Sequence, residues 1–220
     1  MATDGNRASP AGTIKVHHLN NSRSQRVLWL IEELGLAYEV VRYQRDAKTM
    51  LAPAELKRIH PLGKSPVVEN DGQLLAETGA IIEYLVTRYG DGQLAPARDS
   101  TDWWRYIYWL HYAEGSAMPP LLLKLVLDRL GILGWPARSF VTAQLRLHLD
   151  YLEGELGKHA WFVGDEFTAA DVMMSFPLEA AAQRGGLDAG RPKLWGFLQR
   201  IHARPAYRRA LERGGPYSFA

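Results

Sequence analysis

Five consecutive polar residues, 20–24, stand where an apolar, strand-like segment ends and an amphipathic helical pattern begins. Four of them are Asn or Ser, whose side chains each carry a hydrogen-bond donor and favour helix N-termini, and this is more capping capacity than one helix needs. The chain has no cysteine, so a disulfide, a zinc–thiolate site and a cysteine nucleophile are excluded, and any reacting thiol has to arrive with a substrate.

The segments that flank this junction follow an α/β order. Residues 13–19 and 37–43 are rich in β-branched and aromatic side chains, which is typical of strands. Residues 24–35 between them have apolar side chains at helical spacing and end at a glycine, which predicts a helix. Two strands joined by a helix of this length predict a parallel βαβ unit.

The next part of the chain adds a short helix and a hairpin. Polar residues and a proline lead into a short helical pattern at 53–59. Two short strands at 66–70 and 73–76 are joined by Asp71-Gly72, a strong hairpin-turn signal, and helical spacing resumes after Glu77. A mixed four-stranded sheet with helices on its faces fits this order.

The second half of the chain is predicted to be all helical. Residues 92–101 form a linker by their Gly, Pro and polar content, and no strand pattern follows it. In one later segment the apolar residues step by four, four, three and four, which marks one face of a helix: Val141, Leu145, Leu149, Leu152 and Leu156. Thr168 and Asp171 have the spacing of a capping box. We therefore expect two domains, residues 13–91 and 101–220.

Composition limits the class of function. The net charge is +2 and no stretch of Lys and Arg stands out, so nucleic-acid binding is not expected. No run of 18 apolar residues exists and the first dozen residues have no apolar signal-peptide core, so we expect no membrane span and a cytoplasmic protein. The histidines form no metal-like cluster, since the adjacent His17 and His18 face opposite sides of a strand, and no metal is expected.

Three motifs, in the right order and at the right spacing, resemble those of the cytosolic glutathione S-transferases. The run Pro-x-Gly-Lys-x-Pro at 61–66 and the acidic–hydroxyl pair Glu77-Thr78 resemble the glutathione-binding half of that family. The Thr-x-x-Asp cap at 168–171 is similar to one in its helical half. The segment NSRSQRVLWLIEEL, from residue 21, resembles the serine-type branch of fungi and bacteria.

This resemblance covers about residues 13–212 and implies both a fold and a co-substrate. The implied fold is an α/β thioredoxin-like N-terminal domain with a mixed four-stranded sheet, plus an all-α C-terminal domain. A homodimer and glutathione as co-substrate are also implied. The chain departs from many members at Ser65, where Val or Ile is common, and at Thr78, where Ser is common. Both departures keep the needed chemistry, a backbone N–H and C=O in the first case and a hydroxyl in the second.

The resemblance assigns glutathione-binding roles in the α/β half. Pro66 matches a cis-proline of the family, which would turn the backbone N–H and C=O of Ser65 outward to pair with the tripeptide as an added strand would. Thr78, at a helix N-terminus, would bind the γ-glutamyl carboxylate. Glu77 would hold the amine of glutathione. The alternatives are an ordinary proline at the start of a strand and a helix cap without a ligand.

Five further residues are less specific candidates. Lys64 would approach a glutathione carboxylate, or be a solvated surface lysine. His60 would line the site or be structural. The first helix of the second domain is crowded with aromatic residues, and Tyr108 and Tyr112, with Met118, are candidates for the apolar wall of an electrophile pocket between the two halves.

A hydroxyl at the 20–24 junction has a defined task under this resemblance. A free thiol has a pKa of about 8.5, and lowering it by two units requires about 2.7 kcal/mol. One hydrogen bond to a charged group supplies about 1.5–3 kcal/mol, and a helix N-terminus adds about 0.3–1. Ser22 is the first candidate donor, and another serine-type spacing falls on Asn21, whose amide also donates. Asn20, Ser24 and a Ser22 that only caps the helix remain open.

We expect the thiolate of bound glutathione to attack hydrophobic electrophiles. A close alternative is glutathione-dependent reduction of peroxides or disulfides at the same site. An alternative from another class is a non-catalytic glutathione- or ligand-binding or assembly module that keeps the fold. The presence of Lys64, Ser65 and Pro66 together with Glu77-Thr78 argues against this last class, because a scaffold would not need them.

Overall fold

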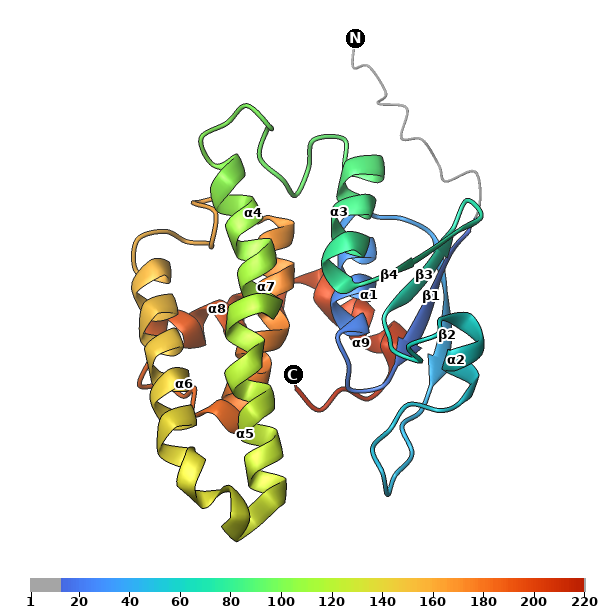
Figure 1. Cartoon of the computed structure of the whole chain (residues 1–220). Helices are drawn as coiled ribbons and strands as arrows, with labels where there is room; N and C mark the ends of the chain where they lie inside the picture. Colours follow the sequence, from blue (N-terminus) through green and yellow to red (C-terminus); the bar gives the residue numbers. More distant parts are fainter. Residues whose placement is uncertain (1–12, 220) are drawn as a thin grey trace. The chain divides into compact units, whose positions relative to one another are not determined.

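The computed structural model describes residues 13–219 (Figure 1). The first dozen residues, for which the sequence predicts no signal-peptide core, lie outside the described part. The described chain divides into two compact units. The first comprises residues 13–94 and 205–218, and the second comprises residues 95–204 and 219.

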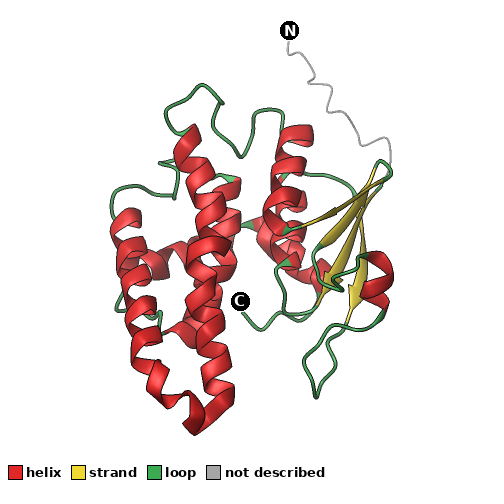
Figure 2. Ribbon diagram, in the orientation of Figure 1, coloured by secondary structure: helices red, strands yellow, loops and turns green. Residues whose placement is uncertain are grey.

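The first unit is an α/β structure with a four-stranded sheet (Figure 2). Its elements, in chain order, are β1 (Ile14–Leu19), α1 (Ser24–Glu33), β2 (Tyr38–Tyr43), α2 (Glu55–Ile59), β3 (Val67–Asn70), β4 (Gln73–Ala76), α3 (Thr78–Tyr89) and α9 (Pro205–Gly214). The strand order in the sheet is β2-β1-β3-β4. The order of elements predicted from the sequence up to α3 is therefore confirmed.

The strand directions bring three chain segments to one edge of the sheet. β1 and β2 are parallel, whereas β3 runs antiparallel to both β1 and β4. The edge at which β1 ends is consequently the edge at which β3 starts and β4 ends. Residues 20–24, 65–66 and 77–78 all lie at this edge.

The hairpin between β3 and β4 has the turn that its sequence predicts. Asp71 and Gly72 have φ angles of 49° and 75°, and two positive φ angles at the central positions are the hallmark of the type I′ turn. The Arg88 guanidinium on α3 donates to the Asp71 carboxylate at 2.6 Å. The turn sets the β3–β4 register, in which Val67 pairs with Ala76.

α9 belongs to the first unit although it is distant in sequence. The Trp29 ring on α1 meets the Tyr207 ring on α9 edge-on, with centroids 5.1 Å apart. The Arg209 guanidinium donates to the Glu32 carboxylate at 2.7 Å. Residues 205–218, which the sequence analysis assigned to the helical segment, thus pack with the first unit because α9 shares a core with α1.

The second unit is helical. Its elements are α4 (Trp103–Tyr112), the π-helical turn η1 (Ala113–Ala117), α5 (Met118–Leu130), the 3₁₀ turn η2 (Gly131–Gly134), α6 (Trp135–Leu156), α7 (Ala169–Ala180), the π-helical turn η3 (Ala181–Gly185) and α8 (Pro192–Ala203). Within residues 95–204 and 219, the β-structure consists of one isolated bridge between Trp161 and Gly164. The all-helical prediction for this half is confirmed.

The cores of these helices follow the predicted faces. The α6 residues that step by four, four, three and four are all buried: Val141, Leu145, Leu149, Leu152 and Leu156. On α4, Tyr106 and Trp109 are buried, whereas Trp104 is 75% exposed. Pro119 stands in the first turn of α5, a position where a missing N–H costs no helical hydrogen bond.

The start of α7 is held by the buried carboxylate of Asp171. Its Oδ2 accepts the Thr168 backbone N–H at 2.8 Å and the Thr168 hydroxyl at 3.2 Å. Its Oδ1 accepts the Phe162 backbone N–H at 3.0 Å. Burial raises the pKa of Asp171 to about 6, and these donors act in the opposite direction. One side chain therefore satisfies backbone groups from two segments of the second unit.

We predict that Asp171→Asn lowers the free energy of unfolding by about 1–3 kcal/mol, because an amide has one acceptor oxygen and leaves a buried N–H without a partner. Urea denaturation followed by circular dichroism measures the change. The matched control is Asp99→Asn, since Asp99 is exposed in the same unit. An equal loss in both variants would contradict the capping role.

Candidate functional site

Ser65 ties the loop before β3 to the end of β1. Its hydroxyl donates to the His17 carbonyl at 2.7 Å and accepts the Leu19 backbone N–H at 3.2 Å. The Ser65–Pro66 peptide bond is cis, as the resemblance implies. The two bonds place Ser65 and Pro66 directly beside the point where β1 passes into the 20–24 junction.

Glu77 and Thr78 lie at the same edge, between β4 and α3. In the β3–β4 ladder Val67 pairs with Ala76, so the residues that follow β4 stand beside those that precede β3. Glu77 has φ 68° and ψ 119°, and a non-glycine residue in this region carries strain of the kind found at binding sites. Its side chain is exposed, whereas Thr78 is buried as the first residue of α3.

The two serines of the junction form a buried pair with His18. The Ser22 and Ser24 hydroxyl oxygens are 2.7 Å apart, and the Ser24 oxygen is 2.9 Å from His18 Nδ1. The Ser22 oxygen also accepts the Ser24 backbone N–H at 3.2 Å. Ser22, Ser24 and His18 are 4%, 0% and 2% exposed. The junction hydroxyls are thus linked to the end of strand β1.

The two asparagines of the junction are held by their amide oxygens. Asn20 Oδ1 accepts the Arg45 backbone N–H, and Asn21 Oδ1 accepts the Ser218 backbone N–H, each at 2.8 Å. The Arg45 guanidinium also donates to the carbonyl oxygens of Asn20 and Met50 at 3.2 and 3.1 Å. Because the side-chain nitrogen of asparagine can only donate, whereas its oxygen accepts, these bonds fix which way each amide is turned.

The surroundings of the His18 ring favour its neutral form. Burial and, to a smaller extent, the charge of Arg42 lower its pKa to about 4, while a backbone hydrogen bond with Gly214 acts in the opposite direction. Arg42 is its register neighbour on β2. The adjacent His17 instead meets Tyr43 and Glu69, with its two ring nitrogens 2.9 and 2.6 Å from their side-chain oxygens.

The two less specific candidates for glutathione binding stand at the loop before β3. Lys64 is exposed and His60 is half-buried. The His60 ring nitrogen Nδ1 accepts the Leu62 backbone N–H at 3.4 Å. The imidazole therefore has a structural contact in its own loop, while the Lys64 ammonium is accessible to a ligand carboxylate.

The candidates for the electrophile wall are grouped on α4 and α5. The Tyr108 and Tyr112 rings, one helical turn apart, have centroids 5.5 Å apart. Tyr112 OH is 2.6 Å from His148 Nδ1, and Tyr108 OH is 3.1 Å from Tyr151 OH. Tyr108 is 46% exposed, whereas Tyr112 and Met118 are buried. Tyr108 is thus the candidate that offers most surface.

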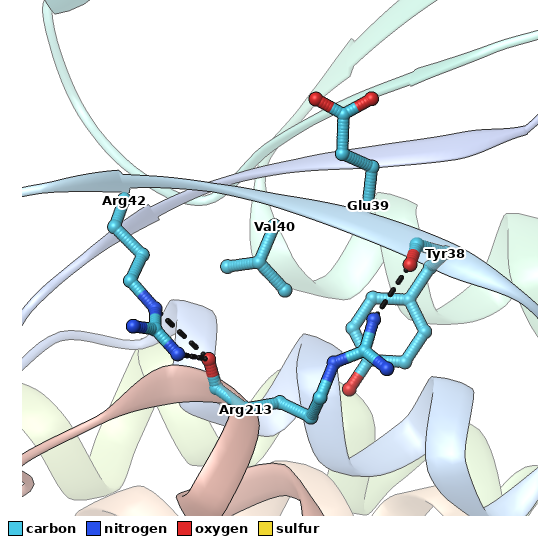
Figure 3. A pocket seen from close by; sticks show the side chains of 5 residues that line it. All are labelled: Tyr38, Glu39, Val40, Arg42 and Arg213. Atoms are coloured by element: carbon cyan, nitrogen blue, oxygen red, sulfur yellow. Dashed lines mark hydrogen bonds between the residues drawn. The ribbon is translucent and has the colours of Figure 1, made fainter.

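A pocket of about 500 Å³ beside β2 has a different lining, which consists of Tyr38, Glu39, Val40, Arg42 and Arg213 (Figure 3). Arg42 donates to the Arg213 carbonyl, and Arg213 donates to the Tyr38 carbonyl at 2.7 Å. The Arg213 guanidinium also lies over the Tyr38 ring, 4.4 Å from its centroid. Both guanidinium groups are therefore hydrogen-bonded within the unit. The predicted site residues do not line this pocket; they lie at the sheet edge described above.

Across residues 13–219, no group of three or more His, Asp or Glu side chains is arranged to hold a metal ion. No helix in the same range has both the length and the apolar character needed to cross a membrane.

The role of His18 at this edge, and that of the segment after α8, were not predicted from the sequence. His18 follows Ile14 and Val16 at alternate positions of β1, and alternate residues share a face of a strand. A polar residue at an otherwise apolar face was therefore a usable signal. No sequence pattern indicated the contacts of Gly214 and Ser218, because these contacts depend on where α9 packs against the first unit.

Three features define the class of the glutathione transferases: an α/β unit of thioredoxin-like strand order, a cis-proline ahead of β3, and an all-helical unit after α3. Sequence models of the glutathione S-transferase N-terminal and C-terminal domains match residues 11–87 and 126–200. The chain belongs to the glutathione S-transferase family, and its activity class is that of this family of enzymes.

Individual relatives cover most of the chain. Glutathione S-transferase 3 of Schizosaccharomyces pombe is 37% identical over 91% of this chain and 87% of its own length. Glutathione S-transferase 1 of Saccharomyces cerevisiae is 35% identical over 78% of this chain and 82% of its own length. The crystal structure of a glutathione S-transferase from Actinobacillus pleuropneumoniae is 36% identical, with a TM-score of 0.85 over 94% of this chain and 95% of that one.

We predict that acid destabilises the first unit through His18. Its pKa is lowered from 6.5 to about 4, so the stability that neutral His18 contributes is complete above pH 6.5 and is lost as the pH falls towards 4. The loss amounts to about 3 kcal/mol. His18→Asn should remove this part of the pH dependence in urea titrations between pH 7 and 4.

The matched control for this experiment is His159→Asn, because His159 is an exposed histidine. This variant should keep the wild-type pH dependence. An unaltered acid profile in His18→Asn would show that another group carries the effect.

Proposed function

We propose that this chain binds glutathione at the sheet edge where β1 ends, β3 starts and β4 ends, and that the bound thiolate attacks hydrophobic electrophiles. The observation that carries the proposal is the convergence of three separate motifs at this edge. The strand register supports it, and so do the bonds from Ser65 to His17 and Leu19. In this proposal residues 13–91 form the glutathione-binding domain.

The tripeptide is held by groups suited to each of its parts. The backbone of Ser65 pairs with the extended peptide as an added strand would. The γ-glutamyl carboxylate lies at the N-terminus of α3, where Thr78 and the free N–H groups favour an anion. Glu77 binds the γ-glutamyl amine. Lys64 approaches the other carboxylate, and His60 lines the loop between Lys64 and α2.

The thiolate is stabilised by a neutral donor at the 20–24 junction. Ser22 is that donor, and its place at the start of α1 adds the helix dipole to its hydrogen bond. Asn21 is the second candidate, since its amide is oriented by the bond from Ser218. Asn20 and Ser24 are weaker candidates, because Asn20 is clamped by Arg45 and Ser24 lies inside the buried pair.

The helical segment, residues 101–220, supplies the wall that binds the electrophile. Tyr108 offers the exposed surface of this wall, and its ring lies beside that of the buried Tyr112. Met118, the third candidate, is buried at the start of α5. An apolar wall of this kind suits a range of hydrophobic electrophiles.

The proposal includes a homodimer. The helical unit exposes large apolar side chains on and between its helices: Trp104, Ile132, Leu133 and Trp135 are 72–91% exposed. Groups of exposed apolar residues mark interaction surfaces. Sedimentation equilibrium measures the mass in solution, and a monomer at all concentrations would remove this part of the proposal.

Capture on immobilised glutathione, followed by conjugation of a chloronitroarene, tests the function directly. Capture with conjugation supports the transferase. Capture with peroxide or disulfide reduction alone supports the reductase, and capture without turnover of either substrate supports a binding module. Failure of capture would end the proposal.

We predict that Ser22→Ala raises the apparent pKa of bound glutathione by about 1–2 units, because it removes one hydrogen bond to a charged sulfur. The dissociation constant of glutathione should change little. Ultraviolet absorption of the thiolate across a pH series measures the pKa. Asn21→Ala is the comparison variant, and a shift there with none in Ser22→Ala would move the role to Asn21.

We predict that Glu77→Ala weakens glutathione binding about tenfold without moving the pKa of the bound thiol, since it removes a charge-assisted bond remote from the sulfur. Calorimetric titration gives the affinity. Glu83→Ala, an exposed glutamate on the same helix, should bind as the wild type does. Wild-type affinity in Glu77→Ala would defeat the assignment.

A further inference from the structure

The side-chain nitrogen of Asn21 is an accessible donor at the 20–24 junction. The Asn21 side-chain oxygen accepts the Ser218 backbone N–H at 2.8 Å, and its backbone carbonyl accepts the Arg45 guanidinium at 3.5 Å. The nitrogen Nδ2 has two N–H groups, and within residues 13–219 neither has an acceptor. Nδ2 is not one of the buried polar atoms without a partner, so it reaches the molecular surface.

The neighbouring polar side chains of the junction are placed differently. Ser22 is 4% exposed, and its hydroxyl oxygen lies 2.7 Å from that of Ser24. Asn20 belongs to the β2 side, since its backbone N–H donates to the Tyr43 carbonyl at 3.1 Å. At Asn21 the angle φ is 50°, a left-handed conformation that changes the direction of the chain between β1 and α1. The Asn21 amide therefore stands at the turn itself.

The segment 215–218 reaches this turn because α9 ends close to it. Gly214, the last residue of α9, packs so closely that an added Cβ would lie 2.7 Å from Gln25 Oε1 on α1. Gly215 has φ 87°, a left-handed conformation that commonly follows a helix, and Pro216 cannot continue one. The chain thus leaves α9 at a fixed point, and Ser218 returns to the junction.

We propose that segment 215–218 positions a donor of the glutathione site. The Ser218 backbone N–H holds the Asn21 side-chain oxygen, and the amide N–H groups of Asn21 donate to the sulfur of bound glutathione. Ser218 acts through Asn21 and is a positioning residue. The inference rests on the proposed glutathione site at the sheet edge, and it holds whether or not Ser22 also donates.

The physical reason is that a carboxamide has two unlike ends. Its NH₂ group attracts a thiolate, whereas its oxygen repels one, and an amide without a partner presents either end. A backbone N–H that occupies the oxygen keeps the NH₂ end for the ligand. Hydrogen bonds in sequence also polarise one another, so the bond from Ser218 strengthens the Asn21 N–H groups as donors to an ionised sulfur.

Variants of Ser218 separate its backbone N–H from its side chain. Ser218→Pro removes the N–H and should raise the pKa of bound glutathione by about 0.5 unit, the equivalent of one modest hydrogen bond. Ser218→Ala keeps the N–H and should have the wild-type pKa. A backbone ester at position 218 removes the same N–H without a proline ring, and it should act as Ser218→Pro does. A wild-type pKa in both would overturn the positioning role.

A double-mutant cycle tests whether Ser218 acts through Asn21. Asn21→Ala should raise the pKa of bound glutathione by about 1 unit, because it removes a hydrogen bond to a charged sulfur. The double variant Asn21→Ala/Ser218→Pro should shift the pKa no further than Asn21→Ala alone. Two shifts that add in full would overturn the positioning role.

Aspartate variants test the donor itself. Asn21→Asp keeps an oxygen for the Ser218 N–H but has no N–H of its own, so it should raise the pKa by more than Asn21→Ala does. The matched control is Asn20→Asp, which adds the same charge one residue away and beside Arg45. It should raise the pKa by less. Equal shifts in the two aspartate variants would overturn the donor role of Asn21.

The results separate this inference from the proposed function. Wild-type chain that is not captured on immobilised glutathione would end both. Capture and conjugation by the wild type, with a wild-type pKa in Asn21→Ala and Ser218→Pro, would overturn this inference and leave the proposed site in place.

Discussion

The hydroxyl of Ser65 is the contact on which the arrangement of the sheet edge depends. The β1–β3 ladder ends at the pair of His17 with Val67. The Ser65 side chain donates to the His17 carbonyl and accepts from the Leu19 N–H, so one hydroxyl continues the bonding of β1 beyond the end of that ladder. The end of β1 stays fixed although the neighbouring strand has not yet begun, and the 20–24 junction starts from a defined position.

The polar groups of this edge divide into those bonded within the protein and those that we propose bind glutathione. One set of side chains is hydrogen-bonded to the backbone of neighbouring segments and so holds the loops together: Asn20, Asn21 and Arg45. The Ser22 oxygen accepts the first N–H of α1, at Ser24, and lies 2.7 Å from the Ser24 hydroxyl oxygen. Glu77 is exposed and has a strained backbone. The junction has more polar side chains than the start of α1 needs, because Asn20 and Asn21 bind backbone groups of other segments.

The features of the fold that depend on neighbouring residues could be predicted from the sequence. The Asp71-Gly72 turn, the leucine face of α6 and the capping residues at 168–171 each follow from a short-range rule of conformation or spacing. The cis bond at Pro66 followed from the family resemblance. The position of α9, the bond from Ser218 and the pairing of Ser24 with His18 depend on tertiary packing between distant segments, and spacing along the chain contains no measure of it.

The return of α9 has a consequence for how the protein is made. Asn21 and Ser218 are hydrogen-bonded although 197 residues separate them, and Gly214 closes against His18 in the same way. A chain that emerges from the ribosome N-terminus first can form its sheet early. Its α/β unit nevertheless includes residues 205–218, so the sheet edge that contains Asn21 is completed only after the helical residues 95–204 have been translated.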